Sequence, residues 1–77
     1  MNFEDVRLQQ VWTFRRLAEV ELQVAASFDR LAATGDPRHR QRRLELAADA
    51  RAEAERARRI ADRYATKPSG ADGDPAG

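Results

Sequence analysis

The tripeptide Gly35-Asp36-Pro37 divides the chain into two helical segments and is the strongest constraint on its fold. Gly35 can adopt the left-handed conformation that ends many helices. Asp36 is a strong N-cap residue, because its carboxylate accepts from the free N–H groups at the start of a helix. Pro37 then takes the first helical position, where its fixed φ angle is suitable and its missing N–H costs nothing. The tripeptide therefore predicts the end of one helix and the start of the next.

No Pro or Gly occurs between residues 3 and 34, so this segment is expected to form one helix on the order of 45–50 Å long. The turn is expected at 35–36, and the second helix from 37 to about 65. A turn this short makes the two helices antiparallel neighbours. Residues 1–66 therefore predict an all-α, antiparallel two-helix hairpin of the coiled-coil type. Residues 67–77 are rich in Gly, Pro, Ser and Asp and are predicted to form a flexible tail.

The first helical segment carries an apolar stripe with the alternating three- and four-residue spacing of a heptad seam. We expect this stripe to pack against the second helix, whose inward positions are mostly alanine, so that Leu17 faces Ala54 and Val24 faces Ala47. Polar side chains within the stripe either fix the register or lie at the edge of the seam. The stripe consists of Phe3, Val6, Gln10, Thr13, Leu17, Val20, Val24, Ser27 and Leu31, and Phe14 and Phe28 widen it.

A second apolar stripe lies on roughly the opposite side of the first helix and includes Leu8, Val11, Trp12 and Leu22. The second helix covers only one side of the first, so this stripe is expected to stay exposed as a patch that marks an interface. We therefore predict a small interaction module, such as an adaptor, a regulator or an accessory subunit. The partner is either a second copy, which completes a four-helix bundle as a homodimer, or a larger protein. Alternatively, Trp12 folds onto the flank of its own hairpin.

Four arginines, Arg38, Arg40, Arg42 and Arg43, open the second helix. The start of a helix carries the positive end of its dipole, so this cluster breaks a local rule of charge placement. Free N–H groups and guanidinium groups together can bind phosphate, which makes the four arginines candidate contacts for nucleic acid or for a phosphate ligand. The alternative is a solvated Arg-rich face, which the interspersed acidic residues and the absence of aromatic residues on that face favour.

The remaining residues exclude most classes of enzymatic site. The chain has no Cys, which excludes disulfides and thiolate zinc sites. Its single His, His39, is expected to lie exposed in the first turn of the second helix rather than to bind a metal or act in catalysis. No Gly-rich phosphate loop and no Glu-x-x-His metal motif occurs. We therefore expect no enzyme, no catalytic or metal site and no cofactor. Without an apolar run of about 18 residues or a basic-then-apolar leader, the chain is expected to be cytoplasmic and to stay out of membranes.

Overall fold

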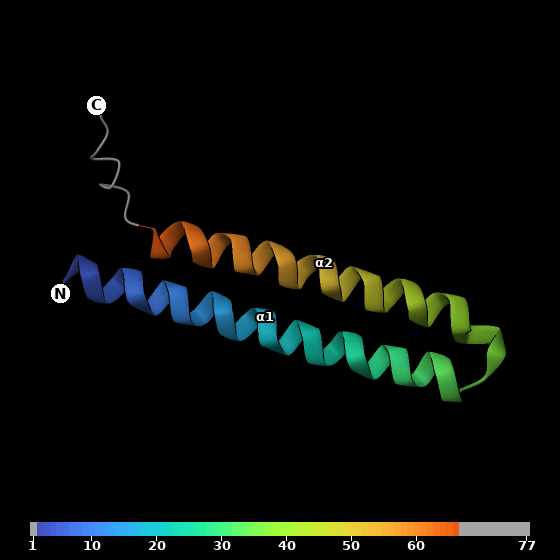
Figure 1. Ribbon diagram of the computed structural model, residues 1–77. Helices are drawn as coiled ribbons and strands as arrows, with labels where there is room; N and C mark the ends of the chain where they lie inside the picture. The colour runs from blue at the N-terminus through green and yellow to red at the C-terminus, as the bar shows by residue number, and fades with distance from the viewer. Residues whose placement is uncertain (1, 67–77) are drawn as a thin grey trace, which may run out of the picture.

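The computed structural model describes residues 2–66 as two long helices that lie side by side (Figure 1). The helix α1 spans Phe3–Thr34, η1 is a single 3₁₀ turn at Pro37–His39, and α2 spans Arg40–Ala65. The start of α1 and the end of α2 lie at the same end of the molecule. The predicted all-α hairpin is therefore confirmed. The predicted tail, residues 67–77, lies outside the described residues.

Capping side chains fix where the helices begin. The side chain of Asn2 accepts from the backbone N–H of Glu4 at 2.8 Å, at the positive end of the α1 dipole. The carboxylate of Asp36 accepts from the backbone N–H of Arg38 at 2.9 Å, as expected of an N-cap followed by Pro37. The segment after this cap begins as a 3₁₀ turn and becomes α-helical at residue 40, later than the predicted start at residue 37.

Gly35 ends α1 for a different reason from the one predicted. Its φ of −92° and ψ of −167° are those of extended backbone, so left-handed freedom is not used. A Cβ atom on Gly35 would lie 2.0 Å from Nη1 of Arg43 and 2.6 Å from the carbonyl oxygen of Leu31. The N–H of Gly35 donates to the same oxygen at 2.8 Å. Glycine is therefore required here because a side chain has no room.

Contacts at both ends of the hairpin define its register. Arg7 donates to the carbonyl oxygen of Tyr64 at 2.9 Å, and Arg40 donates to that of Ala32 at 3.3 Å. Residues that face each other across the hairpin therefore have numbers that add up to 71 or 72. This register puts Phe14 against the alanines of α2, where it packs on Ala54 and Ala57.

The buried seam of α1 lies one residue later than the predicted stripe. Its buried members are Val11, Ala18, Ala25 and Ala32, with Phe14 and Phe28 packed beside them. Leu17, which was expected to face Ala54, is 43% exposed, and Val24 is 37% exposed. One residue corresponds to a rotation of about 100° around the helix axis. The predicted stripe thus lies on the side of the hairpin, about a right angle away from the contact with α2, and the prediction that it packs against α2 was wrong.

Small side chains explain this rotation. The buried residues of α2 are all alanines, as the predicted inward positions of α2 indicated: Ala47, Ala50, Ala54, Ala57 and Ala61. Alanine packed on alanine lets two helix axes approach more closely than leucine on alanine would, and the rings of Phe14 and Phe28 fill the space beside these contacts. The hairpin therefore closes mainly on its smallest side chains and leaves the valines and leucines of the predicted stripe outside.

Candidate interaction surfaces

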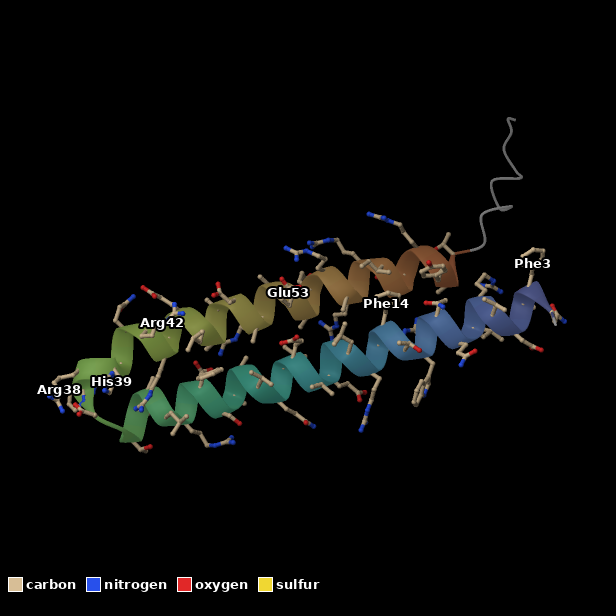
Figure 2. All side chains as sticks on the ribbon, turned by 180° about the vertical axis from the view of Figure 1, so that it is seen from behind. Phe3, Phe14, Arg38, His39, Arg42 and Glu53 are labelled. Carbon is tan, nitrogen blue, oxygen red and sulfur yellow. The ribbon has the colours of Figure 1, made fainter. Side chains whose placement is uncertain are left out.

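The stripe that was expected to be buried instead forms a long exposed surface, here called the valine–leucine face. It consists of Phe3, Val6, Gln10, Thr13, Leu17, Val20, Val24, Ser27 and Leu31. Its valines and leucines are 36% to 46% exposed, and Phe3 projects from the end of α1 with 93% exposure (Figure 2). None of these nine positions is charged, although 35% of the chain is. An exposed, uncharged heptad seam along a whole helix is typical of a surface that packs on another helix.

The valine–leucine face continues onto α2 as an apolar groove. Phe14, Ile60 and Tyr64 line this open groove of about 540 Å³, which Arg7 and Arg63 border. The rings of Phe14 and Tyr64 stack with their centroids 6.1 Å apart. Ile60 directly precedes the buried Ala61 of α2. In the same way, each residue of the face directly precedes a residue of α1 that packs toward α2, as Leu17 precedes Ala18. In an antiparallel pair these positions share one side, so the groove widens the face.

The opposite side of α1 carries the predicted interface, with one correction. Val11 is only 6% exposed and belongs to the interior of the hairpin, so it is not accessible to a partner. It is buried because it stands at a seam position that packs toward α2. Leu8, Trp12 and Leu22 are exposed, and Trp12 keeps 68% of its surface in solvent rather than folding onto the hairpin.

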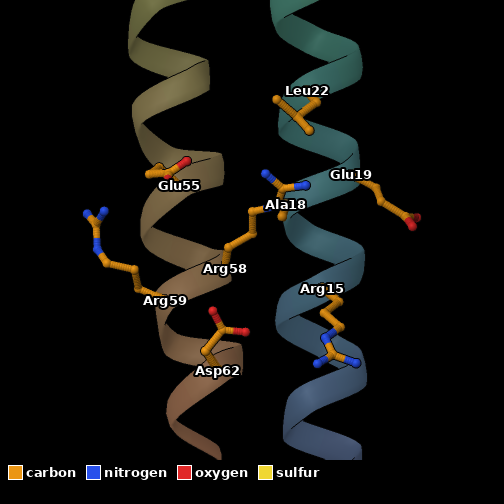
Figure 3. Close-up of a pocket in the computed structure, with 8 residues that line it drawn as sticks. All are labelled: Arg15, Ala18, Glu19, Leu22, Glu55, Arg58, Arg59 and Asp62. Atoms are coloured by element: carbon orange, nitrogen blue, oxygen red, sulfur yellow. The ribbon is translucent and has the colours of Figure 1, made fainter. Parts of the chain in front are cut away.

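Charged side chains interrupt this opposite side. A groove of about 470 Å³ between the helices is lined by Arg15, Ala18, Glu19, Leu22, Glu55, Arg58, Arg59 and Asp62. Arg58 extends from α2 toward α1, whereas Glu19 and Arg59 extend outward (Figure 3). Farther along, Arg51 forms an ion pair with Asp29 across the two helices. Covering this side would remove many charges from water, which is unfavourable unless each one is paired.

Two of the four arginines that follow the turn, Arg38 in η1 and Arg42 in α2, pair with acidic residues nearby. Arg38 lies beside the turn (Figure 2), and its Nη2 donates to the carboxylate of Asp36 at 2.8 Å. This contact lowers the pKa of Asp36 below its usual value. Arg42 forms an ion pair with Glu45, one turn later in the same helix, at 3.5 Å.

The other two arginines extend back to the end of α1. Nε of Arg40 donates to the carbonyl oxygen of Ala32 at 3.3 Å, and Nη1 of Arg43 donates to that of Leu31 at 3.2 Å. The last turn of α1 contains no basic residue of its own, and positive charge is favourable at this end of a helix. The Arg cluster therefore supplies the C-terminal cap of the preceding helix, which the sequence pattern did not reveal. A phosphate bound here would compete with these contacts.

The other end of the hairpin has the same arrangement. Nη1 of Arg7 donates to the carbonyl oxygens of Tyr64 and Ala65 at 2.9 and 3.3 Å, at the end of α2. Its Nη2 donates to the carboxylate of Glu4 at 2.8 Å. An early arginine of each helix thus caps the last carbonyls of the other. The sequence pattern did not indicate this role, because Arg7 is a charged residue on the side of α1 that packs toward α2 and the predicted apolar stripe contains Val6 instead.

Two further observations concern metal binding and membrane spanning in residues 2–66. No group of three or more His, Asp or Glu side chains in this range is placed to hold a metal ion. Neither helix combines the length and the apolar character that crossing a membrane requires. Comparisons with protein-family models, with curated proteins and with solved structures give no match. A functional proposal therefore depends on the surfaces of the hairpin.

Proposed function

We propose that the hairpin is a protein–protein interaction module that self-associates through the valine–leucine face, as a structural or regulatory subunit rather than an enzyme. The observation that carries this proposal is the uncharged heptad seam on the outside of α1. The predicted outer residues Leu8, Trp12 and Leu22 are fewer, and the side they share with Arg15 and Asp29 is charged. The valine–leucine face is therefore the better candidate for the interface.

The composition of the hairpin interior supports association. Eight of the nine buried side chains are alanines, each of which removes about one methyl group from water. A buried valine or leucine contributes roughly 1.5–3 kcal/mol, several times as much as the same estimate gives for a methyl group. The largest remaining gain is thus on the outside, where the valines and leucines of the valine–leucine face keep more than a third of their surface exposed. Small domains with limited cores commonly gain stability by oligomerisation.

The whole side of the hairpin that carries the face, α2 included, has the size of a stable interface. From Phe3 to Leu31 it is about 42 Å long at about 1.5 Å per residue. Two packed helices present a width of about 18 Å, from their axial separation and side-chain diameter. The product, roughly 750 Å², is close to the about 800 Å² that each partner of a standard interface buries.

Sedimentation equilibrium at micromolar concentration tests this proposal. The native chain should sediment above the 8.7 kDa of one chain. A double variant Leu17→Glu/Val24→Glu should sediment as a monomer, because it places two charges in the middle of the face. The matched control Trp12→Glu/Leu22→Glu should keep the native assembly, and circular dichroism should show helical spectra for all three proteins.

Two outcomes would contradict the proposal. A native chain that stays monomeric would remove self-association altogether. Dissociation by Trp12→Glu/Leu22→Glu alone would move the interface to the opposite side of α1, where the sequence pattern first placed it.

A further inference from the structure

The valine–leucine face stands at a right angle to the contact with α2. Each member of the face precedes a seam position by one residue, which rotates it by about 100° around the α1 axis. A helix whose two neighbours lie at about a right angle occupies the corner of a square four-helix bundle. α1 therefore has the side-chain pattern of a helix with two helical neighbours, of which the hairpin supplies one.

The second neighbour of α1 is not an α2 helix. At the corresponding positions α2 has Leu46 and Ile60, but three charged residues lie between them, so it has no continuous apolar stripe to match the face: Asp49, Glu53 and Arg56. The surface that matches it in length, spacing and lack of charge is the same face of another α1. A second copy of this chain is thus the occupant that the pattern favours.

We propose that two copies pack with their α1 helices antiparallel and their valine–leucine faces in contact; this arrangement rests on the self-association proposed above. α1 begins at residue 3 and ends at residue 34, so the two helices overlap fully when facing residues have numbers that add up to 37. The face alternates between the two core positions of the heptad, a and d. In this register each residue at an a position faces a residue at a d position of the partner, as antiparallel seams require. The layers are Gln10 with the partner's Ser27, Leu17 with the partner's Val20, Val24 with the partner's Thr13, and Leu31 with the partner's Val6.

This register also satisfies the polar members of the face. Gln10 meets the partner's Ser27, so an amide and a hydroxyl lie together and can form a hydrogen bond instead of being buried against apolar groups. Beside the seam, Arg16 lies next to the partner's Gln23, which creates no pair of like charges. The polar residues thus act as markers of register.

The antiparallel arrangement brings the two α2 helices together as well. Because facing residues within one hairpin add up to about 72, Leu46 of α2 comes to lie opposite the partner's Ile60. The two Glu53 carboxylates then meet at the middle of the α2 pair, where each is paired with Arg56 of its own helix. Leu46 then covers the groove that Phe14, Ile60 and Tyr64 line. A parallel pair would place the two α2 helices on opposite sides and leave these groups exposed. It would gain ion pairs between Arg16 and the partner's Glu21, but exposed pairs contribute less than the burial of large apolar side chains.

Disulfide trapping tests the orientation, because the chain contains no cysteine of its own. The single variants Gln10→Cys and Ser27→Cys are prepared separately and mixed, and each sample is oxidised or treated with a short thiol crosslinker. We expect a covalent dimer in the mixture and in neither single variant, since like cysteines would lie about 25 Å apart, 17 residues along the helix. Ala52→Cys, on the exposed side of α2, is the control for random collisions.

Each other outcome overturns a defined part of the inference. Covalent dimers of the single variants would show a parallel pair. No crosslink in a mixture that still sediments as a dimer would refute the register while leaving self-association in place. If the mixture and the unmodified chain both sediment as monomers, the proposed function itself is refuted.

Discussion

Replacing Ala25 by Leu tests the alanine seam on which the hairpin closes. Ala25 is 1% exposed and packs with Ala47 and Ala50 of α2. The next residue, Ala26, is exposed. The same substitution at the buried position and at its exposed neighbour therefore separates the alanine seam from a hairpin that closes on Leu17 and Val24.

The expected loss follows from the lack of space at Ala25. Leu adds three carbon atoms between two closely packed helices, and overpacking of this kind costs about 1–3 kcal/mol. In a domain of this size each kcal/mol lowers the melting temperature by about 4–8 °C, so Ala25→Leu should lower it by about 5–20 °C. Ala26→Leu should change stability by less than about 0.5 kcal/mol, because the site is exposed and Ala and Leu are both good helix formers.

Thermal unfolding followed by far-ultraviolet circular dichroism measures both variants beside the native chain. All samples need the same protein concentration, because self-association makes the melting temperature depend on it. Urea unfolding gives an independent ranking of the three proteins. Equal losses in the two variants, or a gain in Ala25→Leu, would refute the alanine seam and favour a hairpin with Leu17 turned toward α2.

Three further predictions concern the ends of the hairpin. Gly35→Ala should lower the free energy of unfolding by at least about 1 kcal/mol, because the added Cβ would lie 2.6 Å from the carbonyl oxygen of Leu31 and would displace Arg43 from that oxygen. An unchanged urea midpoint would contradict this. Arg7→Gln should speed amide hydrogen exchange in the last turn of α2 about fivefold, the equivalent of about 1 kcal/mol, without affecting the middle of the helix. Uniformly faster exchange would point to global destabilisation instead. Because the pKa of Asp36 is lower in the folded chain than its ordinary value of 3.8, this carboxylate stabilises the fold at a pH above 3.8. That stabilisation is lost as the pH falls through the pKa of the folded state. Asp36→Asn should flatten that part of an acid unfolding profile, and an identical profile would argue against this contribution.

Local signals made the helix boundaries predictable. Asn2, Asp36 and Pro37 act on the N–H groups within one turn of themselves, so their effect does not depend on the rest of the fold. The alanines of α2 likewise follow from spacing alone, because α2 has only one continuous row of small side chains. The two-helix hairpin and its register could therefore be derived before any coordinates.

The rotation of α1 could not be derived in this way. The predicted stripe and the buried seam both have heptad spacing, and the seam begins one residue after the stripe. The choice between them depends on how closely Ala18 and Ala25 let α1 approach α2, which is a property of the pair and not of α1. The roles of Arg7 and Arg43 are hidden for the same reason, since each caps carbonyl oxygens that belong to the other helix.

The reciprocal arginine caps make the lengths of the two helices dependent on each other. Helix ends normally fray independently, because terminal residues hold few hydrogen bonds. Here the end of α1 is held by Arg40 and Arg43 and the end of α2 by Arg7, so neither end can open without releasing the first turns of the other helix. Removing one heptad from a single helix would carry an arginine about 10 Å away from its carbonyls. Removing one heptad from each helix keeps both caps, so changes in length are tolerated only in matched pairs.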